Sequence, residues 1–105
     1  MKRLPLSSRE IATALEKLPG WMHSEDKLCK GFRFHTFLGA MRFVNQIAEE
    51  AEAMNHHPSM HISFVEVMVT SCTHDAGNKV TPWDVALATR IERCYQSEAW
   101  KNPVQ

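Results

Sequence analysis

The fold is decided by residues 36–74, which read TFLGAMRFVNQIAEEAEAMNHHPSMHISFVEVMVTSCTH. Thr36 is a residue type that caps helices, and the apolar side chains after it recur at helical spacing. The segment therefore predicts a long amphipathic helix that ends near Met54, and Pro58 prevents its continuation. Residues 59–73 then alternate between apolar and polar and are rich in β-branched types, which predicts two strands or one bent strand.

The segments on either side of this stretch add two helices and a hairpin. Residues 7–10, SSRE, have the spacing of a capping box, and the short helix that they open stops at Pro19-Gly20. Residues 21–34 contain two short strand patterns joined by a polar turn. Residues 81–84, TPWD, place a capping threonine before a proline and an acid, so a last helix is expected to run from there to about Ser97.

The predicted order of elements is α-β-β-α-β-β-α, without an internal repeat. Hairpins that alternate with helices favour an α+β fold, a two-layer sandwich with a four-stranded antiparallel sheet and three helices on one face. A chain of 105 residues is the size of one domain, so residues 1–105 are expected to form a single domain.

Composition excludes several classes of protein. Twelve basic and twelve acidic residues give a formal net charge of zero, which argues against direct nucleic-acid binding through bulk electrostatics. No apolar run is long enough to span a bilayer, and the first ten residues lack the apolar core of a signal peptide. Three widely spaced cysteines favour reduced thiols, so a cytoplasmic protein without a membrane partner is expected.

Histidines are concentrated after the long helix. Four of the six lie within nineteen residues: His56, His57, His61 and His74. Each has an ordinary structural explanation by itself, because cationic side chains suit the C-terminus of a helix and polar residues commonly end strands. His23, His35 and His61 have no chemical neighbours in the sequence that suggest a site.

Considered together, some of these side chains suggest a site for proton transfer. In an antiparallel pair the start of one strand lies beside the end of the next, so His56 and His57 should converge with His74 at one sheet edge. Glu52 precedes His56 by one helical turn and is expected to orient its ring. Asp84 is both a capping acid and a candidate for the same group. Imidazoles, with an ordinary pKa of about 6.5, suit acid/base catalysis at neutral pH.

These motifs resemble those of the pterin-4a-carbinolamine dehydratase family. Its pattern is E-x-x-x-H-H-P, an aromatic residue seven positions after the second histidine, T-H-[DE], and T-x-x-D-x-x-L-A. The matching residues here are Glu52, His56-His57-Pro58, Phe64, Thr73-His74-Asp75 and Thr81–Ala88. The likeness spans about residues 7–97, and the loop at 77–81 is one residue longer than the usual G-G-L-T.

The resemblance implies an enzyme, a hydro-lyase that dehydrates 4a-hydroxytetrahydrobiopterin to quinonoid dihydropterin and water in tetrahydrobiopterin recycling. It implies histidine acid/base catalysis without a cofactor or metal, with His56 and His74 as the acid/base pair and His57 mainly holding the pterin. Further expected substrate-binding residues are Glu52, Pro58, Thr73 and Asp84. A homodimer or homotetramer in the cytoplasm is expected, and by family likeness also in the nucleus.

Three alternatives stay open at this point. His56, His57, His74 and Asp84 supply the ligand types of a zinc site, although adjacent histidines rarely both reach one tetrahedral ion. Animal members of the family also bridge dimers of a transcription factor, so a dimerisation cofactor is a second reading. The third is a pterin-binding role linked to molybdopterin metabolism.

Overall fold

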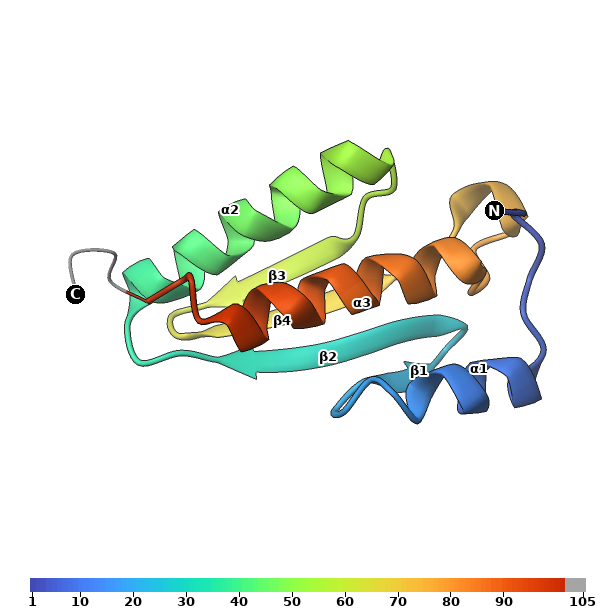
Figure 1. Cartoon of the computed structure of the whole chain (residues 1–105), viewed down its shortest axis with the longest axis horizontal. Helices are drawn as coiled ribbons and strands as arrows, with labels where there is room; N and C mark the ends of the chain where they lie inside the picture. Colours follow the sequence, from blue (N-terminus) through green and yellow to red (C-terminus); the bar gives the residue numbers. More distant parts are fainter. Residues whose placement is uncertain (102–105) are drawn as a thin grey trace.

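The computed structural model describes residues 1–101 and has the predicted order of elements (Figure 1). These are α1 (Ser8–Leu15), β1 (Met22–Ser24), β2 (Lys27–Arg33), α2 (Phe37–Met54), β3 (Ser59–Ser63), β4 (Glu66–Ser71), the short 3-10 helix η1 (His74–Ala76) and α3 (Pro82–Ser97). The predicted α+β class is confirmed. The last four residues of the expected domain, 102–105, lie outside the described part.

The four strands form one antiparallel sheet in the order β1-β2-β4-β3. Leu28 pairs with Ser71 and Phe32 with Val67, so the apolar residues of β2 and β4 share the face that the helices cover. Where β3 pairs with β4, the first residue of β3, Ser59, lies opposite Thr70 near the end of β4. This register brings the chain just before β3 beside the chain just after β4.

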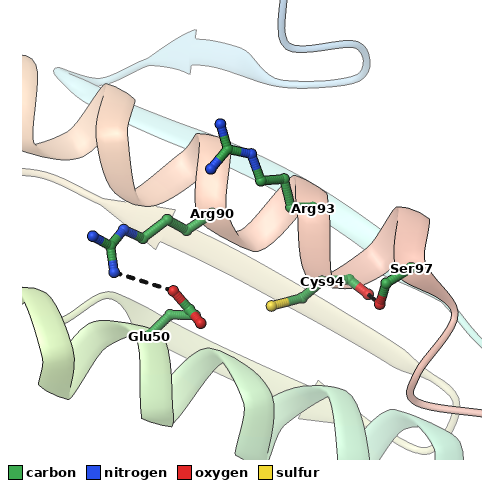
Figure 2. A pocket seen from close by; sticks show the side chains of 5 residues that line it. All are labelled: Glu50, Arg90, Arg93, Cys94 and Ser97. Atoms are coloured by element: carbon green, nitrogen blue, oxygen red, sulfur yellow. Dashed lines mark hydrogen bonds and ion pairs between the residues drawn. The ribbon is translucent and has the colours of Figure 1, made fainter.

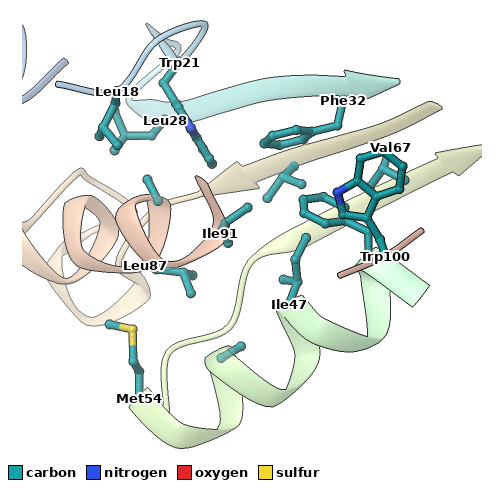
Figure 3. Packing of buried hydrophobic residues seen from close by; sticks show 14 of the residues in the cluster. Leu18, Trp21, Leu28, Phe32, Ile47, Met54, Val67, Leu87, Ile91 and Trp100 are labelled. Atoms are coloured by element: carbon teal, nitrogen blue, oxygen red, sulfur yellow. The ribbon is translucent and has the colours of Figure 1, made fainter. Parts of the chain in front are cut away.

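Helices α2 and α3 lie side by side across the sheet and pack against its central strands (Figure 1). Their buried side chains form one continuous core with the inner face of β2 and β4 (Figure 3). Among its fully buried members are Leu28, Phe43, Ile47, Val67, Val69, Leu87 and Ile91. Helix α1 contributes Ile11 to the same cluster. Burial of this apolar surface is the main source of the domain's stability.

The predicted starts of the three helices are confirmed by their capping contacts, whereas α1 ends at Leu15, before the predicted stop at Pro19-Gly20. Ser7 and Glu10 form a reciprocal capping box at α1, and Thr81 and Asp84 form another at α3. The side chain of Thr36 accepts a hydrogen bond from a backbone N–H of the first turn of α2. These contacts satisfy backbone donors that the helices leave free. In residues 1–101, no helix combines the length and hydrophobicity needed to cross a membrane.

Candidate active site

The candidate site lies where the chain turns from α2 into β3. Asn55 ends α2 in the left-handed conformation, with φ of 52°, and the N–H of His56 donates to the carbonyl of Ala51 at 3.0 Å. Left-handed backbone at this position terminates a helix and redirects the chain. Pro58 follows and is half-buried, so the two histidines are held in a short, restricted connection at the sheet edge.

A pocket of about 250 Å³ opens at this edge. It is lined by His56, His57 and His74 together with Arg3, Asn55, Cys72 and Asp75. The predicted convergence of three histidines is therefore confirmed, and the pairing of β3 with β4 is its cause.

A larger hollow of about 360 Å³ lies between α2 and α3, away from the histidines (Figure 2). Its lining includes Glu50 and Arg90, which form an ion pair at 3.2 Å, and Cys94, whose pKa is raised by burial and by nearby carboxylates. It contains no group with an ordinary pKa near neutral, so the histidine pocket is the stronger candidate for proton transfer.

Asp84 binds the ring of His56 from below the pocket. Its Oδ1 accepts from His56 Nε2 at 2.7 Å and from the hydroxyl of Ser71. Its Oδ2 accepts from Thr73 Oγ1 at 2.7 Å and from the backbone N–H of Thr81 at 2.9 Å. Four donors occupy the acceptor positions of an ionised carboxylate, so this fully buried group is acceptor-only and completely satisfied.

The hydrogen bonds around Thr73 also have a defined direction. Thr73 gives its single hydroxyl hydrogen to Asp84, so the 2.6 Å contact between the two threonine hydroxyls must be donated by Thr81. Both threonines are fully buried. Asp84 thus serves both as the acid of the α3 capping box and as the hydrogen-bond partner of His56. This links the histidine ring to the start of a helix.

Glu52 contacts His57 and not His56, so the prediction that it orients His56 is wrong. Its Oε2 lies 2.6 Å from His57 Nε2, and both side chains are exposed. The one-turn spacing applies only within a continuous helix, and the left-handed Asn55 breaks the helix between Glu52 and His56. The turn directs His56 inward, where it is 5% exposed, and leaves His57 at the surface.

His74 lines the same pocket from the start of η1. Its Nδ1 lies 3.0 Å from Oδ1 of Asn78, and its side chain is exposed. The backbone N–H of Thr73 donates to the carbonyl of Lys79 at 2.8 Å and closes the loop behind it. The additional residue in this loop is accommodated without moving Asp84 away from His56.

Four lining residues were missed from the sequence. Asn55, Cys72 and Asp75 are sequence neighbours of the predicted histidines, and this proximity was the signal that could have found them. The pKa of the Cys72 thiol is raised by burial and by the negative charge of Asp84, so the thiol stays protonated at neutral pH. Arg3 is more than fifty residues from the nearest of the three histidines, and no local pattern indicates its place.

The zinc alternative finds no support in this geometry. His56 is directed to a carboxylate beneath the pocket, and His57 pairs with Glu52 at the surface. Within residues 1–101, no three side chains of His, Cys, Asp or Glu are arranged so that they could hold one metal ion.

Comparison with known proteins finds a family model, "Pterin 4 alpha carbinolamine dehydratase", that matches residues 4–94. A protein of Opitutus terrae is 46% identical over 88 residues, which cover 84% of this chain and 91% of the relative. A protein of Sulfurisphaera tokodaii is 40% identical over 87 residues, covering 83% and 92%. Both bear the name "Putative pterin-4-alpha-carbinolamine dehydratase".

Solved structures agree with this match. The crystal structure of a "transcriptional coactivator/pterin dehydratase" from Brucella melitensis is similar with a TM-score of 0.81 and 32% identity, covering 86% of this chain and 97% of that one. A pterin dehydratase-like protein described as a RuBisCO assembly factor has a TM-score of 0.58 at 19% identity, which shows a shared fold.

Proposed function

The chain belongs to the pterin-4-alpha-carbinolamine dehydratase family, and on that premise we propose that it dehydrates a 4a-hydroxytetrahydropterin by histidine acid/base catalysis. The observation that carries the proposal is the convergence of His56, His57 and His74 on one pocket. The reaction breaks the bond between C4a and its hydroxyl oxygen and removes a proton from the neighbouring ring nitrogen. The products are a quinonoid dihydropterin and water.

His56 and His74 are the proposed acid/base pair. The Nε2 of His56 donates to Asp84, and the Nδ1 of His74 faces the amide oxygen of Asn78. Each ring therefore uses one nitrogen for orientation, and the other nitrogen is left to exchange a proton with the substrate. One imidazole protonates the hydroxyl as it leaves, while the other accepts the ring proton.

Asp84 and Thr73 are positioning residues in this proposal. Both are fully buried, so their side chains act through His56 and not by contact with the pterin. A carboxylate that accepts the far N–H of a histidine fixes its tautomer and stabilises its protonated form. His57, paired with the exposed Glu52, holds the pterin, and Pro58 restricts the backbone beside it.

The finer parts of the proposal rest on family membership. They are the biopterin side chain of the substrate, the place in tetrahydrobiopterin recycling, the cytoplasm as the compartment, and assembly as a homodimer or homotetramer. The sheet is compatible with assembly because β3 is an edge strand whose residues are mostly exposed. Light scattering at micromolar concentration is expected to give at least twice the monomer mass, and a strictly monomeric mass would contradict the assembly.

The catalytic proposal is tested by following the dehydration of synthetic 4a-hydroxytetrahydropterin in the ultraviolet, with protein treated with a chelator. We expect wild-type protein to exceed the spontaneous rate, and His74→Ala to lower kcat by about 10²–10⁴-fold. Its Tm should barely change because His74 is exposed. His61→Ala, an exposed histidine of β3 outside the pocket, is the matched control and should keep full activity. Near-normal turnover of His74→Ala would remove His74 from the site.

A further inference from the structure

The first six residues pass the start of α3 (Figure 1). One of their side chains reaches the histidine pocket. The N–H of Leu6 donates to the carbonyl of Val80 at 2.8 Å, and the indole N–H of Trp83 donates to the carbonyl of Met1 at 3.3 Å. Between these two contacts Arg3 lines the pocket. The segment is therefore held at two points, on both sides of the arginine.

The guanidinium of Arg3 is held by an aromatic ring and not by a carboxylate. It lies 4.6 Å from the centre of the Trp83 ring, the distance of a cation–π contact. The ring of Trp83 is in turn 6.1 Å from that of His56. Among residues 1–101, no carboxylate forms an ion pair with Arg3. Contact through the face of a guanidinium leaves the N–H donors at its edge available.

The neighbouring acids are mostly committed to other partners. Asp84 is saturated by four donors beneath the pocket, and Glu52 pairs with His57. Asp75 is the one carboxylate among the described residues that line the pocket, and it forms no ion pair with Arg3. The exposed N–H donors of Arg3 are therefore open to an oxygen acceptor of a ligand, which a guanidinium binds through one or two charge-assisted hydrogen bonds.

We propose that Arg3 is a substrate-binding residue that donates hydrogen bonds to an oxygen of the pterin. This inference rests on the proposed function and adds to it a contact that family membership does not predict, because Arg3 precedes the matched residues 4–94. The oxygen acceptor is the ring carbonyl, which every pterin carries, or a hydroxyl of the side chain. The two sources have different consequences for substrate selectivity, and two probes separate them.

The test measures equilibrium binding of two stable pterins by fluorescence, using untagged full-length protein. 7,8-Dihydrobiopterin carries side-chain hydroxyls, and 6-methyl-7,8-dihydropterin carries none. We expect Arg3→Ala to raise the Kd by about 10-fold, the effect of losing a hydrogen bond to a charged group. Arg3→Lys, which keeps the charge but loses the planar fork, should fall between. Lys2→Ala is the matched control, because it removes a positive charge from the residue next to Arg3. The side chain of Lys2 is exposed and does not line the pocket.

The outcomes separate the two claims. A raised Kd for both probes supports the ring carbonyl, and a raised Kd for 7,8-dihydrobiopterin alone supports the side chain. Unchanged Kd values in Arg3→Ala overturn the inference about Arg3, while wild-type activity leaves the proposed function standing. An equal rise of the Kd in Lys2→Ala also overturns the inference about Arg3, because the effect would then come from the loss of any nearby positive charge. Wild-type protein that neither binds these pterins nor accelerates dehydration would contradict the proposed function itself.

Discussion

Replacing Asp84 with alanine tests whether this carboxylate holds the site together or only caps α3. The change removes the acceptor of four donors at once: the His56 ring, the hydroxyls of Ser71 and Thr73, and the backbone N–H of Thr81. All lie in a part of the structure from which solvent is excluded, since the exposed fraction of each of these side chains is 5% or less.

The expected loss of stability follows from these contacts. Losing a helix cap costs about 1 kcal/mol. A buried donor left without a partner costs about 1–3 kcal/mol, and the hydroxyls of Ser71 and Thr73 can recover part of this by rotating toward another acceptor. The total is on the order of 3–5 kcal/mol, since several buried donors lose their acceptor at once. In a domain of this size, that lowers Tm by about 15–30 °C.

Urea unfolding followed by circular dichroism measures this loss, with an unchanged m value as evidence that the two-state analysis applies. Asp75→Ala, which removes an exposed acid of the same pocket, is the control and should stay within about 0.5 kcal/mol of wild type. Ser71→Ala removes a single donor and gives a folded intermediate case. A loss of only about 1 kcal/mol in Asp84→Ala would show that capping is its whole contribution.

Three further predictions concern other ionisable groups. The pKa of Glu92 is lowered from its ordinary 4.5, because hydrogen bonds, led by that from Lys30, outweigh the opposing effect of burial. The stabilisation that the ion pair gives should therefore be complete above pH 4.5 and disappear as the pH falls through the lowered pKa. Glu92→Gln should therefore lower the urea midpoint most at pH 7 and progressively less as the pH is lowered below 4.5; a loss that does not change with pH would be contrary evidence. Glu52→Gln should cost under about 0.5 kcal/mol because its pair with His57 is exposed, and a loss above 1 kcal/mol in the same assay would be inconsistent with that. Cys72, whose pKa is raised by burial and by Asp84, should react with iodoacetamide far more slowly at pH 7 in folded than in urea-unfolded protein, and equal rates by mass spectrometry would argue against it.

The fold was predictable in most of its parts, and one boundary shows where local signals end. The helices were found because capping residues and apolar periodicity act within a few neighbouring residues. Local residues do not predict the turn between β3 and β4, since Phe64-Val65 contains none of the usual turn residues. Phe64 adopts a φ of 52° there and is 72% exposed, a conformation that strand pairing imposes on an aromatic residue.

The sequence by itself determined the three capped helices, the four strands and the convergence of His56 and His57 with His74, because periodicity and antiparallel pairing leave little choice of register. Tertiary structure decided which carboxylate each histidine contacts. Asp84 reaches His56 across twenty-eight residues only because α3 begins beneath the end of β4, and Glu52 is directed to His57 because Asn55 ends α2 between them. Arg3 joins the pocket in the same way, through the packing of the first residues against Trp83. Contacts of this kind depend on how layers pack and on the direction in which a chain leaves a helix, and neither is encoded within a few neighbouring residues.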